Sequence, residues 1–322
     1  MKSYIVSIII PVYNVEKYIV KCATTLFEQD FDSIEYIFVN DCSPDNSMQV
    51  LQSVIEKYPN RKNDIKIINK PQNEGLGQAR KTGFESATGE YILHIDSDDW
   101  VEFDMVSSMY KKAKEDDADI VVCDFYENYS NKQIYIKQDL VFDDYETYLK
   151  DCFTLKNKYV SIWSKFCKKK VYEKIKFPTF SNAEDFFLHI QMFYYYYGKI
   201  VHFNRAFVHY NRINESSITY HNVSEKKIKE LKAFNLEILE FFKKNDIYEK
   251  FIEYHYMGLL YRIVVVSGGK YKKYIKDICL EANKLKYIWN NYGLDLLKKI
   301  VVTFNFFNIN MYAILKNIQG RA

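Results

Sequence analysis

The amino-acid sequence predicts an α/β fold, with a mainly parallel sheet flanked by helices and a helical C-terminal extension. Short, almost wholly apolar runs rich in β-branched residues are typical of strands buried on both faces. They alternate with segments in which apolar residues recur at helical spacing, and repeated strand–helix units imply parallel strands. Polar clusters follow several of the runs directly, as expected where strands end.

The elements of the first half follow in a regular order. Each apolar run of strand length is followed by a polar break, such as the cluster 40–47, and then by an amphipathic segment. The predicted strands are residues 6–12, 34–39, 65–68, 91–95 and 119–123, and the predicted helices are residues 15–29, 47–57, 77–87 and 103–116.

Composition excludes several classes of protein. The 322 residues, 48% of them hydrophobic, suffice for one large or two ordinary domains. A formal net charge of +3 gives no basic field that would favour nucleic acid as a partner. The six cysteines show no CxxC pair and no leader is visible, so we expect free thiols in a reducing cytoplasm. An apolar run of about 18 residues, which would predict a transmembrane helix, is absent from the sequence.

The most informative segment follows the predicted strand 91–95, where Asp96, Asp98 and Asp99 crowd into four positions with Ser97 between them. Like charges this close repel one another, so we expect a compensating cation. Carboxylates at a strand end suit Mg²⁺ or Mn²⁺, especially when a diphosphate supplies the remaining ligands. The alternative is a solvated acidic turn in which Asp98 or Asp99 caps the next helix.

Polar residues also follow the first two strands, at 11–14 and 40–41. In open α/β sheets, ligands bind outside the carboxyl ends of the strands, so these clusters and the acidic one predict a single site. The absence of GxxxxGKS/T and GxGxxG after the first strand disfavours P-loop NTPases and dinucleotide dehydrogenases. Gly75 and Gly77 precede a helix with Arg80, which suits an anion site, although an ordinary helix entry with a solvated arginine is the alternative.

Five segments, in this order, resemble the family 2 glycosyltransferases, which are inverting enzymes with a GT-A fold that use nucleotide-sugar donors. They are residues 7–14, 39–47, 73–80, 87–91 and 96–99, and weaker matches continue to about residue 220. The closest resemblance is to enzymes that build bacterial capsular, exopolysaccharide and other cell-surface glycans.

The resemblance implies roles for individual residues. Asp41 accepts a hydrogen bond from uracil N3–H, Asp96 is directed to the ribose, and Asp98, in the DxD motif, to Mn²⁺ or Mg²⁺ on the diphosphate. A bound cation would stabilise the charge that develops on the leaving UDP. The other implied nucleotide-sugar-binding residues are Pro11, Val12, Tyr13, Asn14, Arg80, Ser97 and Asp99. Cys42 stands where the family usually has glycine, and if that position needs a positive φ, the loop must be arranged differently here.

Inverting displacement requires a base that takes the proton of the acceptor hydroxyl. The resemblance assigns this role to Asp185, with Glu184 as its neighbour, at the start of a predicted helix. A carboxylate held among the aromatic residues that follow would be partly desolvated and therefore more basic. The alternative is that both acids only complement the helix N-terminus.

Two further segments resemble the surface-polysaccharide enzymes. Trp163 and Lys165 look like a Trp-x-Lys segment that lines the donor-sugar and acceptor pocket. Arg212, with residues 216–218, looks like a loop that closes over the donor, its guanidinium binding the diphosphate bidentately; a surface loop with a solvated arginine is the alternative. The histidines in apolar settings are expected to be structural, namely His94, His189 and His202.

The character of the chain changes near residue 224. We divide it into a catalytic domain, 1–222, with a nucleotide-sugar-binding half to about 125 and an acceptor-binding half from 126, and a helical region, 223–322. Helices are expected at 226–244, 247–266 and 271–286. The apolar and lysine-rich tail fits an amphipathic helix on the inner face of the membrane, and equally a helical pair packed on the catalytic domain or an oligomer contact.

These patterns together predict a cytoplasmic glycosyltransferase, a hexosyltransferase of EC class 2.4, that moves a sugar with inversion in bacterial surface-polysaccharide synthesis. The expected partners are a UDP-sugar donor and a hydroxyl of a glycan or lipid-linked oligosaccharide acceptor. A sugar-nucleotidyltransferase is the first alternative, but residues 11–17 lack the Gly-rich, basic signature it would need. A non-catalytic nucleotide-sugar-binding protein is the second, and it could dispense with Asp185.

Overall fold

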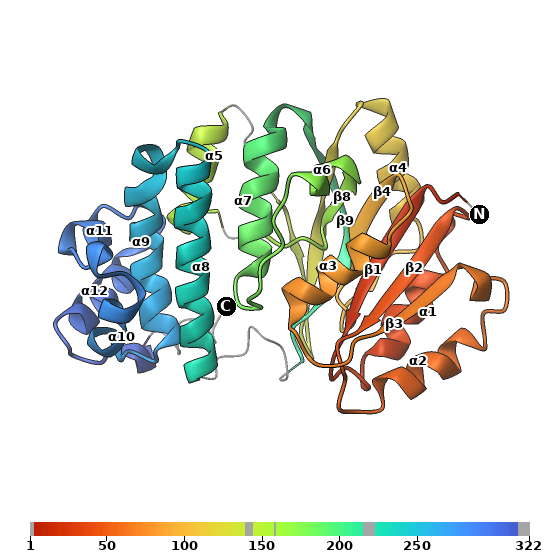
Figure 1. Ribbon diagram of the computed structural model, residues 1–322, viewed down its shortest axis with the longest axis horizontal. Helices are drawn as coiled ribbons and strands as arrows, with labels where there is room; N and C mark the ends of the chain where they lie inside the picture. The colour runs from red at the N-terminus through yellow and green to blue at the C-terminus, as the bar shows by residue number, and fades with distance from the viewer. Residues whose placement is uncertain (1–2, 139–143, 158, 215–222, 315–322) are drawn as a thin grey trace. The chain divides into compact units, whose positions relative to one another are not determined.

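The computed structural model describes residues 3–138, 144–157, 159–214 and 223–314 (Figure 1). The chain divides into two compact units. The first comprises Met1–Leu140, Ser161–Thr179 and Gln191–Ser217, and the second Val141–Val160, Phe180–Ile190 and Ile218–Ala322. The helical unit thus takes in two stretches from the middle of the chain in addition to the C-terminal region.

The first unit is built on one sheet, in which the described strands run in the order β3-β2-β1-β4-β8-β6-β9-β5, with β7 paired to β6. β1 is parallel to β2 and β4, β2 to β3, and β6 to β9, whereas β8 is antiparallel to both β4 and β6. The strands are β1 (Val6–Val12), β2 (Ile34–Asn40), β3 (Ile65–Asn69), β4 (Tyr91–His94), β5 (Trp100–Val101), β6 (Ile120–Asn128), β7 (Gln133–Ile136), β8 (Lys165–Lys168) and β9 (Ile200–Asn211). The predicted fold class is confirmed, and the antiparallel strands of the second half are an addition to it.

Burial explains why the central strands read as continuous apolar runs. All seven residues of β1 and all four of β4 are buried, because these strands have neighbours on both sides and helices over both faces. β3 lies at the edge of the sheet, and its Lys66 and Asn69 are exposed.

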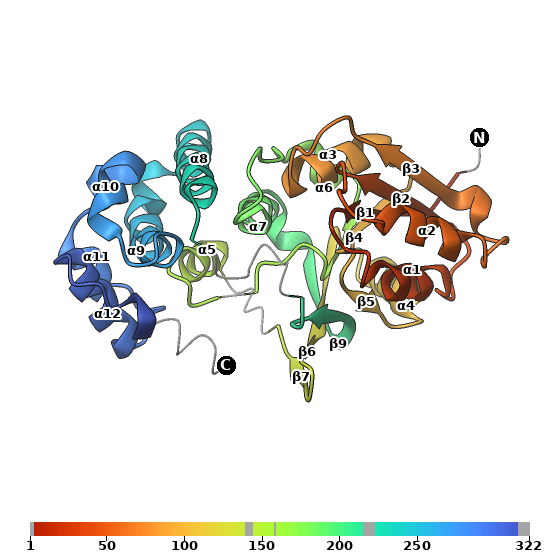
Figure 2. The ribbon, with the colours of Figure 1, turned by 90° about the horizontal axis from the view of Figure 1, so that it is seen from below.

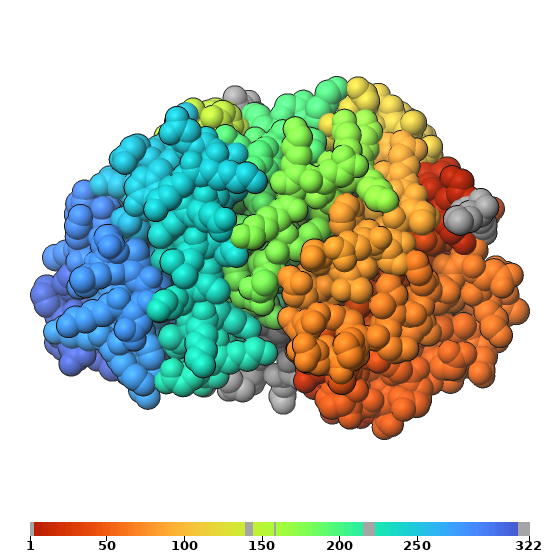
Figure 3. All heavy atoms as spheres, in the orientation of Figure 1, coloured from red at the N-terminus to blue at the C-terminus, as the bar shows by residue number. Residues whose placement is uncertain are grey.

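Helices cover both faces of this sheet (Figures 1 and 2). On one face α4 lies beside the end of α1, where Val106 N donates to Gln29 Oε1 at 3.0 Å. On the other face α3 lies beside α6, with the Phe84 and Tyr172 rings 5.4 Å apart. In the space-filling view the orange atoms of the α3 region adjoin the yellow-green atoms of the α6 region (Figure 3). The helices of this unit are α1 (Ile19–Phe27), α2 (Ser47–Ile55), α3 (Leu76–Ser86), α4 (Met105–Glu115) and α6 (Lys170–Glu173), with 3₁₀ turns at Lys62–Asp64 and Tyr197–Lys199.

The second unit is helical and has an aromatic core. The Phe153 ring contacts those of Phe186, Phe242 and Phe251, and the buried His255 bonds Asn235 Oδ1 at 2.8 Å. Its helices are α5 (Tyr145–Phe153), the first half of α7 (Glu184–Tyr196), α8 (Glu225–Lys244), α9 (Tyr248–Val266), α10 (Tyr271–Cys279), α11 (Leu285–Trp289) and α12 (Leu296–Phe306), with a 3₁₀ turn at Leu280–Ala282. The helix predicted over 271–286 is therefore interrupted. Among the described residues, none of the helices combines the length and the apolar character that crossing a bilayer requires.

Candidate nucleotide-sugar site

The structure brings the three polar clusters that follow β1, β2 and β4 to one edge of the sheet. β1 lies between β2 and β4, and all three strands run in the same direction. The loop after β2 is tied to the end of β1 by a 3.0 Å hydrogen bond from Asp41 N to Val12 O. The thiol of Cys22, on α1, donates to the carbonyl of Asp96 at 3.6 Å. The predicted convergence of these clusters is therefore confirmed.

The loops after β1 and β2 fix each other through the backbone. The N–H groups of residues 14, 15 and 16 donate to the side chains of Ser43, Ser47 and Asp45 at 2.8, 2.9 and 2.9 Å. Burial alone would raise the pKa of Asp45, but hydrogen bonds from the Ser43 and Ser47 hydroxyls and from the backbone N–H groups of Glu16 and Ser47 bring it below its ordinary value. These three N–H groups bind the neighbouring loop, so the helix does not start at the predicted residue 15. The helix α1 begins at Ile19. Tyr13 keeps 48% of its surface exposed at this edge.

Cys42 adopts a left-handed backbone conformation with φ of 58°. The expectation that a cysteine would require a different loop arrangement is not met, because this cysteine adopts a positive φ itself. A non-glycine residue in this region is uncommon, and the left-handed conformation costs about 1–2 kcal/mol. The loop thus keeps Asp41 in place with stored backbone strain.

Asp41 is buried, and both of its carboxylate oxygens are occupied. Oδ1 and Oδ2 accept from the backbone N–H groups of Glu74 and Gly75 at 3.0 and 2.8 Å. The ammonium of Lys70 lies 3.1 Å from Oδ1 and 2.6 Å from Glu74 Oε2. Asp41 therefore joins the ends of β2 and β3 to the entry of α3. Oδ1 has two partners, whereas Oδ2 has one and keeps a second lone pair for a ligand.

Arg80 is fully buried on α3, and its Nη2 lies 2.9 Å from Asp96 Oδ1. The solvated arginine weighed as an alternative is therefore wrong. The Asp96 side chain keeps 22% of its surface exposed, so this carboxylate faces the protein cation on one side and solvent on the other. The pair connects α3 to the end of β4.

Asp98 and Asp99 are held by the segment that follows β9. Asp98 Oδ2 accepts from Asn214 Nδ2 at 2.7 Å, and Asp99 Oδ1 accepts from the backbone N–H of Asn211 at 2.8 Å. Burial raises the pKa of Asp98, and burial together with the charges of Asp98 and Asp96 raises that of Asp99 well above its usual range. Within the described part of the chain, Asp99 Oδ2 is buried without a hydrogen-bond partner.

These residues fit a divalent cation that is held partly by a ligand. The described residues contain no group of three or more His, Cys, Asp or Glu side chains placed to bind a metal by themselves. Mg²⁺ and Mn²⁺, however, commonly use one or two carboxylates and complete their coordination with substrate phosphates. Asp98 is partly exposed and stands in a cluster with Asp96 and Asp99, so it offers the carboxylate oxygen for this role.

The segment 87–91 has a packing role at the start of β4. Thr88 N and Gly89 N both donate to the buried Glu35 carboxylate, and Gly89 N also reaches Ser7 Oγ at 2.8 Å. A Cβ at Gly89 would lie 2.6 Å from Ser7 N, so only glycine allows this approach. The glycine anchors the start of β4 to β1 and β2.

The residues of the second half that were predicted to line the pocket all contact other residues of the protein. Lys165 is fully buried in β8 and donates to the carbonyl of Ser161, so it does not line an open pocket, which corrects that expectation. Trp163 stacks on Tyr210 with ring centroids 5.6 Å apart. Arg212 donates to Glu127 through Nε at 2.9 Å and also through Nη2, and its side chain keeps 37% of its surface exposed, so it is paired with a carboxylate and still open to solvent. Residues 216–218, assigned to the donor-closing loop, lie outside the described residues.

The histidines expected to be structural have internal partners or are fully buried. Burial and the nearby Arg80 hold the pKa of His94 well below its usual range, so it stays neutral. His189 bonds Tyr148 Oη at 2.9 Å, and His202 bonds Asp124 Oδ1 at 2.8 Å. All six cysteines are described and unpaired, as predicted, and only Cys42 is exposed.

Glu184 and Asp185 belong to the second unit, where they form the first turn of α7. Glu184 is buried, with 2% of its surface exposed, whereas Asp185 is partly exposed. Ala183 precedes them with φ of 69°, a strained conformation for a residue with a Cβ.

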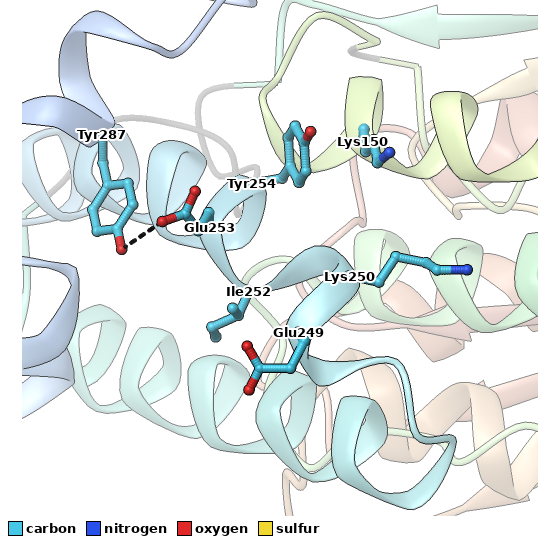
Figure 4. Close-up of a pocket in the computed structure, with 7 residues that line it drawn as sticks. All are labelled: Lys150, Glu249, Lys250, Ile252, Glu253, Tyr254 and Tyr287. Atoms are coloured by element: carbon cyan, nitrogen blue, oxygen red, sulfur yellow. Dashed lines mark hydrogen bonds between the residues drawn. The ribbon is translucent and has the colours of Figure 1, made fainter.

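The second unit also contains a shallow pocket between α5, α9 and α11 (Figure 4). Its lining is Lys150, Glu249, Lys250, Ile252, Glu253, Tyr254 and Tyr287. None of the residues predicted to bind nucleotide-sugar or to act as base is among them, and two of its charged groups, Glu253 and Lys250, pair with Lys286 and Glu146 outside the lining.

Sequence reasoning missed the residues that hold the predicted ones in place, namely Lys70, Glu127, Asn211 and Asn214. Lys70 could have been found, because it follows β3 and the same rule of strand ends applies to it. Asn211 and Asn214 could not, because β9 pairs with β5 only through a long-range antiparallel contact.

The model of the family described as Glycosyl transferase family 2 matches residues 7–180. The chain belongs to this family. Glycosyltransferase GlyA of Streptococcus pneumoniae is 33% identical over 229 residues, which cover 66% of this chain and 31% of that protein. EpsH of Bacillus subtilis is 33% identical over 227 residues, covering 68% of this chain and 63% of EpsH. The chain thus spans less than two thirds of the length of these relatives.

Solved structures show the fold of this family member. TarS 1–349 of Staphylococcus aureus, in complex with UDP-GlcNAc, has a TM-score of 0.65 and 20% identity, covering 98% of this chain and 92% of that chain. The mannosyltransferase PcManGT of Pyrobaculum calidifontis, in complex with GDP-Man and Mn²⁺, has a TM-score of 0.54 and 14% identity, covering 99% and 88%. The chain therefore has the GT-A fold, with helices at its C-terminal end.

Proposed function

We propose that the protein is an inverting glycosyltransferase that moves a sugar from a UDP-sugar to a hydroxyl of a bacterial surface glycan or its lipid-linked precursor. The observation that carries the proposal is the gathering of Asp41, Arg80 and the acidic cluster at one sheet edge in a chain of this family. The family match gives no support to the nucleotidyltransferase alternative. A binding protein without catalysis remains as an outcome of the test below.

In this proposal the donor lies across the edge formed by β1, β2 and β4. The exposed Tyr13 ring and the segment Pro11–Asn14 cover the base, and Asp41 accepts its N3–H through the second lone pair of Oδ2. Asp96, already oriented by Arg80, receives the ribose hydroxyls on its exposed side. Ser97 and Asp99 support the acidic turn from beneath, since both are buried.

Asp98 is the residue that would hold Mn²⁺ or Mg²⁺ together with the diphosphate. When bound, such a cation supplies charge stabilisation to the departing diphosphate as a Lewis acid. Arg212 is proposed to assist only after exchange of its Glu127 contact for a phosphate, because the guanidinium now bonds that carboxylate. Trp163 and Lys165 are buried, so they act indirectly, by shaping the part of the site that β8 forms.

Asp185 is proposed as the base. It takes the proton of the acceptor hydroxyl while that oxygen forms its bond to the anomeric carbon. The bond from this carbon to the diphosphate oxygen breaks at the same time, and its electron pair leaves with UDP. Attack opposite to the leaving group inverts the anomeric configuration. The buried Glu184 and the strained Ala183 orient Asp185 from the helix entry.

The test is a UDP-sugar binding and turnover screen with Mn²⁺, with Mg²⁺ and with EDTA. We expect one UDP-sugar to bind in a metal-dependent manner and to be hydrolysed slowly. Asp185→Asn should lower transfer and hydrolysis about 10²-fold to 10⁴-fold while leaving the Kd for UDP unchanged. Glu173→Gln, on α6, is the control acid. Turnover at the wild-type rate in Asp185→Asn would contradict the base, and UDP binding without turnover by the wild type would favour the binding protein.

We also propose that the cytoplasmic protein contacts the membrane through one face of α12. Leu296, Phe304 and Phe307 keep 65%, 40% and 58% of their surface exposed at helical spacing, whereas Val301 and Val302 on the other face are buried. Residues 284–314 carry four lysines and one aspartate, so this surface has a net charge of +3. An apolar helix face beside lysines is complementary to an anionic bilayer.

Flotation with vesicles of phosphatidylcholine alone, or with added phosphatidylglycerol, tests this contact. Leu296→Glu and Phe304→Glu should each reduce binding to the anionic vesicles several-fold, because each removes buried apolar area and adds repulsion. Leu236→Glu is the matched control, since Leu236 on α8 is also 55% exposed. Sedimentation of the wild type as a dimer that Leu296→Glu dissociates, without vesicle binding, would assign this face to a second copy instead.

A further inference from the structure

Arg262, on α9, differs from the other arginines of the described chain. Of these five arginines, Arg61 donates to three backbone carbonyls, and Arg80, Arg205 and Arg212 each pair with a carboxylate. Arg262 has no hydrogen bond or ion pair with any described residue, and its contacts are with aromatic rings. It is the one cation of this type that lacks an oxygen partner within the described part of the chain.

The rings hold the guanidinium against the first turn of α7, the turn that also carries the proposed base. Its Cζ lies 4.5 Å from the centroid of Phe186 and 5.4 Å from that of Phe234. Phe186 follows Asp185 directly in α7, so the cation is fixed next to the first turn that carries this carboxylate. All of these residues belong to the second unit, and their contacts lie within it.

An unpaired, desolvated guanidinium is costly, and aromatic faces compensate for only part of that cost. Burial lowers the pKa of Arg262 to about 10, and the groups that oppose this shift, Tyr261 and Cys152, are not carboxylates. The residue as a whole is partly exposed, and its nitrogen atoms are not among the fully enclosed ones. The head group is therefore reachable from solvent and carries unused N–H donors.

We propose that Arg262 forms an anion subsite that binds a phosphate group of the acceptor beside Asp185. A guanidinium presents a planar fork of donors that matches phosphate oxygens bidentately, and its desolvated, ring-packed setting strengthens such a bond. The subsite would position the acceptor hydroxyl rather than take part in the bond exchange, so Arg262 is a positioning residue. The inference rests on the proposed function, in that it names the chemical class of the acceptor.

Two sources offer this chemistry, a phosphodiester within a polymer and the diphosphate of a lipid-linked precursor. Calorimetric titration of the full chain with glycerophosphoglycerol and with a short prenyl diphosphate distinguishes them. We expect the wild type to bind one of these probes, and Arg262→Gln to bind it about tenfold to a hundredfold more weakly. Arg262→Lys should fall between the two, because it keeps the charge and loses the fork.

Arg205→Gln is the matched control. Arg205 also lies over a phenylalanine ring, at 4.6 Å, but it forms an ion pair with the carboxylate of Asp104. It should bind the probe as the wild type does, and all variants should bind UDP equally. Equal probe affinity of wild type and Arg262→Gln, or tighter binding of glucuronic acid than of either phosphate probe, would overturn the proposal. Loss of UDP affinity in Arg262→Gln would assign the arginine to the donor. Failure of the wild type to bind UDP while it binds the probe would instead count against the proposed function.

Discussion

Removal of the Arg80 guanidinium should destabilise the first unit by about 3 kcal/mol. Arg80 is fully buried, and its Nη2 is 2.9 Å from Asp96 Oδ1. Methionine at this position keeps an unbranched apolar stem, so the change removes charge and hydrogen bonds more than volume. It leaves the carboxylates of Asp96, Asp98 and Asp99 without their buried cation.

The magnitude follows from the burial of the two partners. Breaking a buried ion pair by removing one partner costs about 3–5 kcal/mol. The Asp96 side chain keeps 22% of its surface exposed, so solvent screens part of its charge and the lower end applies. Burial already raises the pKa of Asp98, and Arg80 opposes that rise. Without Arg80 the folded-state pKa climbs further, and stability is lost as the pH rises through it, so the deficit should be larger at pH 8 than at pH 5.

Urea unfolding followed by tryptophan fluorescence measures the change. Trp100 and Trp163 lie in the first unit and Trp289 in the second, so a Trp289→Phe background makes the signal report on the first unit alone. Lys81→Met is the control, because this neighbouring lysine is exposed and its pair with Glu85 lies on the surface. A loss below about 1 kcal/mol, or strict additivity of Arg80→Met with Asp96→Asn, would refute the reasoning.

Three other substitutions test contacts that stabilise the first unit. Cys42→Gly should raise the free energy of unfolding by about 1 kcal/mol, because it relieves the left-handed backbone, whereas Cys42→Ala should not. Gly89→Ala should lower it by about 1–3 kcal/mol, since the new Cβ would meet Ser7 N, and Gly198→Ala, which has open space, is the control. Lys199 and Lys168 lower the pKa of Asp117 to about 2, so its stabilising contribution is lost as the pH falls through that value. Asp117→Asn should therefore flatten the stability curve between about pH 4 and pH 2, measured by acid titration of circular dichroism.

The strands of the first half were predictable because their burial has a local signature. β1 and β4 are covered on both faces, so every residue except His94 is apolar or small and the run is visible without any knowledge of its neighbours. The rule that ligands gather at carboxyl ends then placed Asp41 and Asp98 at one edge. By contrast, β9 has both exposed and buried residues and pairs with segments more than 70 residues away, which no local pattern reveals.

The contacts of the site residues also could not be predicted from the local sequence. Lys165 looked like a pocket lysine, but its burial depends on β8 lying between β4 and β6. The loop at Cys42 illustrates the opposite error. A cysteine in place of glycine suggested a rearranged loop, yet Cys42 adopts a positive φ itself, in a loop whose side chains accept hydrogen bonds from the backbone of residues 14–16. Strain persists where the neighbourhood determines the backbone more strongly than the residue does.

The charge balance of the edge links its stability to its proposed ligand. Three carboxylates face one buried guanidinium, and the raised pKa values of Asp98 and Asp99 show that the ionised cluster is unfavourable by itself. A ligand that brings a divalent cation relieves this repulsion, whereas free UDP adds negative charge to it. UDP and Mn²⁺ should therefore each increase the affinity of the other by the same factor. In saturating Mn²⁺, UDP at 100 times its Kd should stabilise the folded chain by about a further 2.7 kcal/mol, and Asp98→Asn should remove the coupling while sparing the folded state.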